Sequence, residues 1–158
     1  MIQVYDAFND EYERNGNVVL DPIECTATFS LDGNWSMHIE LPITKNMSTL
    51  DDISVVAADT PYGKKQRYRI YGHSKNETKM SLECLPIFFD ARNHILMDVR
   101  PTNKNGQEAL NTMLSGTGFT GKSNISKIET SYYVQKNIME AINGSDENSF
   151  TNRWGGEI

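Results

Sequence analysis

The sequence predicts a mainly β protein of the α+β class, with a small β-barrel-like or split-barrel-like domain over residues 1–99 and a small α/β subdomain over residues 100–158. Three observations lead to this fold class. Up to Val99, apolar residues recur at every second position, which is the period of a half-buried strand. Turn-forming residues separate these segments at short intervals, as they do in barrels and sandwiches. After Arg100 the apolar spacing becomes that of a helix.

The clearest strands form a predicted hairpin over residues 24–41, "ECTATFSLDGNWSMHIEL". Asp32-Gly33-Asn34 supplies a tight turn. Apolar and polar residues alternate on both arms, so one face of the hairpin is expected to be buried. The apolar positions are Cys25, Ala27, Phe29 and Leu31 on the first arm, and Trp35, Met37, Ile39 and Leu41 on the second.

Further strands complete the predicted sheet. A second hairpin covers residues 66–86, with its turn at Lys75-Asn76-Glu77. Between the hairpins, "ISVVAAD" predicts a short buried strand and "TPYGKKQ" its exit turn. "IQVY" at the start and "VVL" at residues 18–20 are predicted edge pieces. In the second hairpin, Tyr68 and Ile70 are expected to oppose Met80, Leu82 and Cys84.

The α/β subdomain begins with a predicted helix in "TNKNGQEALNTMLSGTGF". Asn105 and Glu108 have the spacing of a capping box, and Gly116 or Gly118 stands where the helix would end. The residues on its apolar face are Ala109, Leu110, Met113 and Leu114.

A strand and a second helix are predicted to follow. The stretch "SNISKIETSYYVQ", residues 123–135, alternates at period two and predicts a strand. "KNIMEAINGSD" places Ile138, Ala141 and Ile142 on one helical face, with Gly144 as a left-handed stop. Because about fifty residues bury little surface alone, we expect this subdomain to lean on the β domain, on a partner or on further chain.

Charge and hydropathy limit the function classes. Fifteen Lys and Arg against twenty-one Asp and Glu give a net charge of −6, which argues against a surface that neutralises nucleic-acid phosphates. The first residues, "MIQVYDAFND", lack a secretory signal, and no window approaches the roughly 20 apolar residues of a membrane span. We therefore expect the chain to be made and kept in the cytosol.

No residue pattern predicts a cofactor, a metal site or a catalytic group. Two cysteines are too few for a disulfide framework, and both are predicted to be buried. The histidines lack metal-ligand spacing. A nucleophilic pair of Cys84 and His94 is disfavoured, because Cys84 occupies an inward strand position that shields its thiol. Asp51-Asp52 and Asp146-Glu147 lie in polar turns, where solvation and capping explain them.

Residues 116–123, "GTGFTGKS", match the spacing of a phosphate-binding loop. Such a loop follows a buried strand and precedes a helix, so that backbone N–H groups and a helix N-terminus both point at phosphate. Here the predicted order is inverted, since a helix precedes the loop and a strand follows it. The glycines are therefore interpreted as a helix stop and a turn.

Two longer stretches, "LDPIECTATFSLDGNWSMHIELPI" at residues 20–43 and "AINGSDENSFTNRWGGEI" at residues 141–158, resemble the N-terminal region of phage tail proteins. Members of this family are called minor structural protein, prophage endopeptidase tail protein or tail-associated lysin. The resemblance covers nearly the whole chain, and its more specific part is the motif NSF-x-x-RWGGE. The residues that supply it are Asn148, Ser149, Phe150, Arg153, Trp154, Gly155, Gly156 and Glu157.

This resemblance implies a baseplate-hub-like fold and a structural role in the virion tail. Members of the family assemble as a trimeric ring at the tip of the tail tube, beside the distal tail and tape measure proteins, and DNA passes through without specific binding. The family's chains continue past the motif into further strands, so we expect an N-terminal piece of a longer protein. Peptidase activity in the family belongs to C-terminal domains, so no catalytic residue, cofactor or metal is expected here.

Phe150, Arg153 and Trp154 are the candidate assembly contacts, because aromatic and Arg side chains are favoured interface anchors. The alternative is that Trp154 packs in the core of its own chain. A different function is a carbohydrate-binding or adhesion module that stacks sugars on Trp35, Tyr68 and Tyr71. The expected inward direction of Trp35 and Tyr68 disfavours that function.

Overall fold

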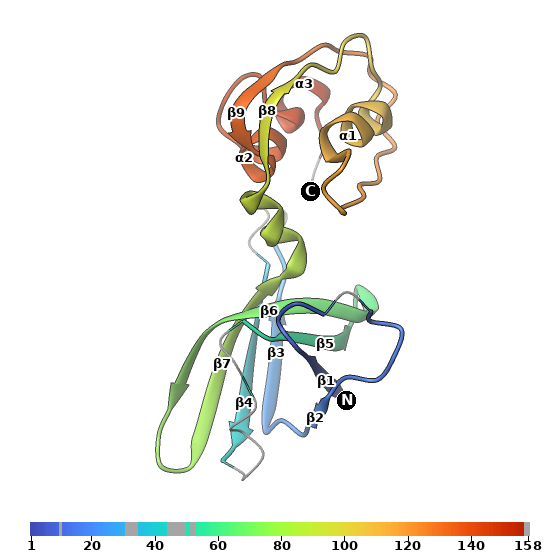
Figure 1. Cartoon of the computed structure of the whole chain (residues 1–158). Coiled ribbons are helices and arrows are strands. Elements are labelled where there is room, and N and C mark those ends of the chain that lie inside the picture. Colours follow the sequence, from blue (N-terminus) through green and yellow to red (C-terminus); the bar gives the residue numbers. More distant parts are fainter. Residues whose placement is uncertain (10, 31–34, 44–49, 51–52, 157–158) are drawn as a thin grey trace. The chain divides into compact units, whose positions relative to one another are not determined.

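A computed structural model describes residues 1–9, 11–30, 35–43, 50 and 53–156. The chain is mainly β, as predicted: a curled, seven-stranded antiparallel half-barrel sheet is followed by a small second sheet and a few helices (Figure 1). It divides into two compact units, Met1–Ile87 and Phe88–Ile158. The sequence placed the boundary after Val99. The difference arises because the strand that ends at Val99 pairs with a strand of the second unit.

The first unit consists of one antiparallel sheet with the strand order β2-β1-β5-β6-β7-β4-β3. Both predicted hairpins are confirmed, with Cys25 opposite Ile39 in one and Ile70 opposite Cys84 in the other. The turn predicted at Asp32-Gly33-Asn34 lies outside the described residues. The strands are β1 (Ile2–Tyr5), β2 (Val18–Leu20), β3 (Glu24–Thr28), β4 (Ser36–Pro42), β5 (Val55–Thr60), β6 (Gly63–Lys75) and β7 (Lys79–Pro86).

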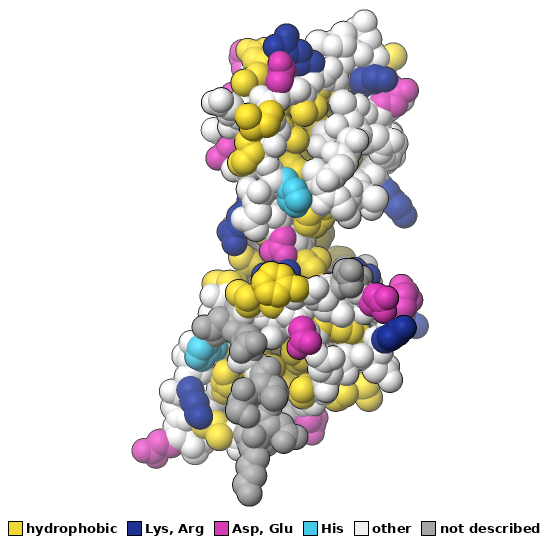
Figure 2. Space-filling model, in the orientation of Figure 1, with side chains coloured by type: hydrophobic (Ala, Val, Ile, Leu, Met, Phe, Trp, Pro, Cys, Tyr) yellow, Lys and Arg dark blue, Asp and Glu magenta, His cyan; other side chains and the backbone are white. Residues whose placement is uncertain are grey.

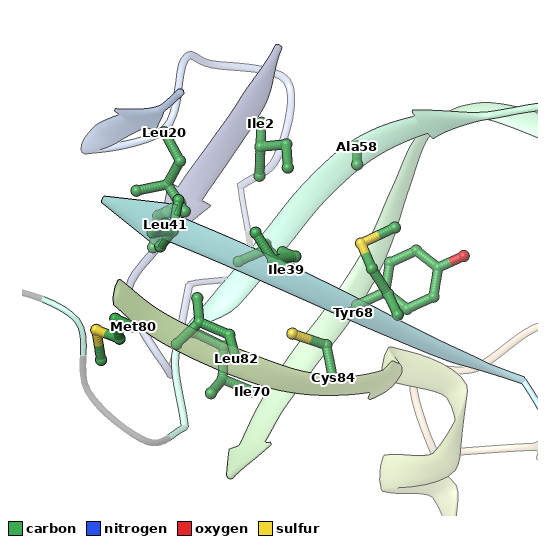
Figure 3. Close-up of a cluster of buried hydrophobic side chains, with 13 residues drawn as sticks. Ile2, Leu20, Ile39, Leu41, Ala58, Tyr68, Ile70, Met80, Leu82 and Cys84 are labelled. Atoms are coloured by element: carbon green, nitrogen blue, oxygen red, sulfur yellow. The ribbon is translucent and has the colours of Figure 1, made fainter. Parts of the chain in front are cut away.

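The core of this unit lies on one face of the curled sheet. Its side chains come from β1, β2 and β4 to β7, and Figure 3 shows them converging, among them Ile39, Tyr68 and Leu82. Each of these three is at most 2% exposed. Strand β5 is buried on both faces. Val56 and Ala58 join this core, and Val55 and Ala57 pack with Tyr5 and Ile87 on the other face of the sheet. This explains why its sequence is a continuous apolar run.

Two predictions about the edges of this sheet are wrong. The segment "IQVY" is β1, which lies between β2 and β5 instead of at an edge. Cys25 is exposed, although the sequence predicted a buried thiol. It lies on β3, the last strand of the sheet, where no described strand covers its outer side. Cys84, on the central strand β7, is fully buried as predicted.

The two thiols are expected to react very differently with Ellman's reagent. Burial raises the pKa of the Cys84 thiol to about 12, so almost no nucleophilic thiolate is present near neutral pH. Cys25 is accessible at the edge strand. One thiol should therefore react in the native chain and two after denaturation, and Cys25→Ser should remove the native reaction. Rapid native reaction of both thiols would contradict the burial of Cys84.

The second unit joins a two-stranded antiparallel sheet to short helices. It has an apolar core of its own, built from residues of both strands and all three α-helices. We expected this subdomain to lean on other parts for its core, but the structure gives it an apolar core of its own. The elements are the 3₁₀ helix η2 (Ile87–Asn93), β8 (Ile95–Val99), α1 (Gly106–Leu114), β9 (Tyr133–Asn137), α2 (Ile138–Asn143) and α3 (Phe150–Trp154).

Helix α1 is confirmed in detail. The Asn105 side chain accepts a hydrogen bond from the Glu108 N–H, and the Glu108 carboxylate accepts one from the Asn105 N–H, which together form the capping box. The predicted apolar face is buried. After the helix, Gly116 and Gly118 have φ angles of 77° and 80°, the left-handed region that glycine adopts without strain.

Two local predictions in this unit are wrong. The stretch 123–135 is strand only from Tyr133 onward. Its earlier residues bond to α1 and to the chain just before α1: the Ser123 N–H donates to the Gln107 side chain, and Glu129 forms an isolated β-bridge with Lys104. Gly144 ends α2 with φ −70°, so it is not left-handed. Glycine fits there because a Cβ would stand 2.3 Å from the Glu140 carbonyl oxygen.

Candidate functional site

The C-terminal motif forms a buried turn of helix in the second unit. Phe150 and Trp154 are one helical turn apart in α3, 6% and 3% exposed, with stacked rings whose centroids lie 5.2 Å apart. The Trp154 indole Nε1 donates to the Lys104 carbonyl at 2.8 Å. Gly155 follows with a φ of 83°. Within the described chain, the rings of two candidate assembly contacts thus belong to the core.

Arg153, the third candidate contact, is half-buried and has partners inside the unit. Its Nη2 donates to the Asn148 Oδ1 at 2.7 Å, and its carbonyl accepts from the Lys127 Nζ at 2.6 Å. The Asn148 carbonyl in turn accepts from the buried Ser131 Oγ at 2.6 Å. The motif therefore fastens the extended segment 127–131 to α3.

An acidic residue beside the motif is held by two donors. The Asp146 carboxylate pairs with Lys136 of β9 and accepts the Asn148 N–H at 2.7 Å. These hydrogen bonds, the one from Lys136 first, lower the pKa of the Asp146 carboxyl below its usual value. A lowered pKa means that this contribution to stability is present above the pKa of the unfolded chain and is lost as the pH falls through the folded value. The pair is a structural link between β9 and the motif.

An exposed apolar patch lies on the small sheet. Figure 2 shows apolar side chains gathered on the second unit over β8 and β9. The strongly exposed apolar residues of β8, of β9 and of the position just before β9, between 46% and 66% accessible, are Ile95, Met97, Val134 and Tyr132, and we call them the β8–β9 patch. Sequence reasoning missed this patch, although the alternation in "ILMDV" puts Ile95 and Met97 on the other face of β8 from the buried Leu96. Grouped apolar side chains on a surface often mark a contact site.

The second unit also contains a cavity of about 750 Å³. Helices α1, α2 and α3 supply apolar side chains to its lining, among them Leu110, Ile138 and Phe150. Its remaining lining includes the extended segment 119–125 and Gly155 and Gly156 of the motif. Sequence reasoning missed the cavity, because its lining is spread over some seventy positions of the chain and no local pattern marks it.

The segment that matches a phosphate loop does not form one. Helix α1 precedes it, as predicted, but the chain directly after it is irregular and the predicted strand begins only at Tyr133. Several backbone N–H groups that a phosphate would need are already bonded within the chain: Thr117 donates to the Leu114 carbonyl, Phe119 to the Thr117 Oγ1 and Ser123 to the Gln107 Oε1. Donors that are satisfied internally cannot cradle an anion.

Other predicted site residues are scattered over the first unit. The predicted sugar platform is not formed, because Tyr68 is buried, Trp35 is half-buried and only Tyr71 is exposed. His38 pairs with Glu83 across β4 and β7 at 2.7 Å. No group of three His, Cys, Asp or Glu that could hold a metal is found in the described ranges. Asp51-Asp52 lies outside them.

Comparison with known proteins leaves the family open. No family model matches the chain, and no curated protein matches it. The helices of the described residues are all too short or too polar to cross a membrane.

Proposed function

We propose that the chain is a structural component of the tail tip or baseplate hub of a phage or prophage, where it forms a ring that joins the tail tube to distal tail parts. The resemblance of residues 20–43 and 141–158 to phage tail proteins is the reason for proposing a tail as the assembly. In this role the full-length protein is a homotrimer that contacts the distal tail and tape measure proteins. The ring belongs to the virion tail and is made in the host cytoplasm.

The observation on the fold that carries this proposal is the open half-barrel sheet. Its strand order begins at β2 and ends at β3, so both edge strands lack a second neighbour among the described strands. Unpaired backbone groups at a sheet edge are a template for pairing with another chain. Four of the five residues of β3 are exposed, so β3 is better placed than β2 to pair with another chain. Pairing at β3 would let copies of the chain extend one another's sheets.

Two further features support an assembly role. The β8–β9 patch offers apolar surface that a neighbouring subunit can cover. The net charge of −6 disfavours adhesion of the ring to the phosphates of passing DNA.

Virions test the assignment directly. Purified particles of a phage that encodes this chain should contain it as a stoichiometric tail protein, and antibodies against residues 1–87 should label the tail tip in electron micrographs. A chain found in lysates but absent from the particles would contradict the proposal.

A single substitution on the edge strand should weaken assembly without unfolding the chain. Thr26 is exposed on β3, and a lysine at a sheet edge discourages pairing with another chain. We expect Thr26→Lys to lower the self-association constant at least about tenfold by sedimentation, a change of 1.4 kcal/mol. Thr102→Lys, an equal charge change at an exposed site of the second unit, should leave it unchanged. Equal association of both variants would exclude the β3 edge.

A carbohydrate-binding or adhesion module is the alternative function. The burial of Tyr68 removes one of the three aromatic rings on which it depends. Binding on a glycan array that Tyr71→Ala abolishes would favour this alternative over the hub.

A further inference from the structure

The cavity of the second unit combines an apolar interior with a polar segment at its border. Leu110 and Leu114 of α1, Ile138 and Ile142 of α2 and Phe150 of α3 supply the apolar lining. The polar side chains of the lining come mainly from one segment, residues 120–124, with the sequence "TGKSN". A volume of about 750 Å³ falls within the range of pockets that hold small organic ligands.

Hydrogen bonds fix this polar segment against α1. The Gln107 Nε2 donates to the Gly121 carbonyl at 2.9 Å, and the Gln107 Oε1 accepts the Ser123 N–H at 2.8 Å. The Gly106 N–H donates to the Ile125 carbonyl at 3.0 Å. At Gly121 a Cβ would stand 3.1 Å from the Cδ1 atoms of Leu110 and Leu114, so the backbone passes close to the helix. The cavity wall is therefore held in place before any ligand arrives.

The charge on the cavity lining is positive. Lys122 is the single charged residue among the described residues that border the cavity, and no described residue forms an ion pair with it. The Lys122 ammonium carries three donors, and the neighbouring Ser123 hydroxyl and Asn124 amide can donate as well. A carboxylate accepts hydrogen bonds only, and such bonds from a cation are stronger than those between neutral groups. The border thus suits an anion, while the interior suits an apolar chain.

We propose that this cavity binds a small amphipathic carboxylate, with its apolar chain among the helices and its carboxylate at Lys122. Phosphate esters fit less well, because the backbone N–H groups of Thr117, Phe119 and Ser123 are already bonded inside the unit. The proposal concerns the second unit by itself and is independent of the assembly role.

Decanoate is a suitable probe, with decanol as an uncharged ligand of equal chain length. In the full chain, decanoate should shift the backbone amide resonances of residues 107–125 and 138–142 saturably. Its affinity should exceed that of decanol about tenfold, the effect of one charge-assisted contact. Lys122→Met should lower the decanoate affinity about tenfold and leave decanol unaffected. Lys75→Met, an exposed lysine of the first unit, is the matched control and should change neither.

A second variant tests the apolar interior. Met139 is half-buried on α2 and borders the cavity, so Met139→Trp should fill the space and abolish binding of both probes in a chain that stays folded. Absence of saturable shifts in the parent chain would overturn the proposal. So would equal decanoate affinity in the parent and Lys122→Met, or undiminished binding to folded Met139→Trp.

Discussion

Trp154→Ala is expected to lower the free energy of unfolding of the second unit by about 3–5 kcal/mol, the usual cost of removing a large buried aromatic ring. Trp154 is 3% exposed, stacks on Phe150 and donates its indole N–H to the Lys104 carbonyl. Its loss leaves a cavity between α3 and the rest of the core, and it removes one of the two hydrogen bonds that the Lys104 carbonyl accepts, the other coming from the Glu129 N–H. Hydrogen exchange of the α1 amides in denaturant measures the change.

The size of this effect separates the two interpretations of the motif. If Trp154 were chiefly an assembly contact, Trp154→Ala would weaken association and leave the stability of the isolated unit unchanged. Trp154→Phe is the matched control, because it retains an aromatic ring and removes the hydrogen bond, and it should cost only about 0.5–1.5 kcal/mol. A loss below 1 kcal/mol for Trp154→Ala would contradict the core placement.

The second large effect is expected in the first unit. Ile39 is completely buried on β4, between strands β3 and β7, and lies within the core that Figure 3 shows. Ile39→Ala should lower the free energy of unfolding of this unit by about 2–5 kcal/mol, because it removes buried methylene groups and leaves a void. Trp35 is the tryptophan of the first unit, so its fluorescence in the Trp154→Phe background reports unfolding there.

An exposed position of the same sheet provides the comparison. Val19 on β2 is 55% exposed, and Val19→Ala should change the free energy of unfolding by less than about 0.5 kcal/mol. Equal effects of Ile39→Ala and Val19→Ala would mean that the curled sheet does not enclose the predicted core. A selective loss in Ile39→Ala with the second unit intact would also show that the two units unfold separately.

The features that the sequence predicted well have local signals. The hairpin of β6 and β7 is marked by alternation on both sides of Asn76, whose side chain accepts from the backbone of Thr78 and Lys79. Helix α1 is marked by its capping box and by glycines that adopt positive φ after it. In each case the residues that decide the structure are neighbours in the chain.

The features that the sequence did not predict depend on distant residues. Cys25 alternates like a core residue, but its exposure follows from the place of β3 at the end of the strand order. The stretch from Ser123 alternates like a strand, but the backbone of Ser123 and Ile125 bonds to Gln107 and Gly106 of α1. The cavity and the β8–β9 patch likewise arise only when separate segments come together. The spacing of apolar residues in the sequence does not show which distant segment each residue will contact.

In the proposed tail-tip ring, the β scaffold docks with copies of itself. The most direct measurement combines light scattering with negative-stain electron microscopy on the complete gene product that carries this chain. We expect a mass of three subunits and a ring with threefold symmetry. A monomer at every concentration, with no ring in the images, would contradict it.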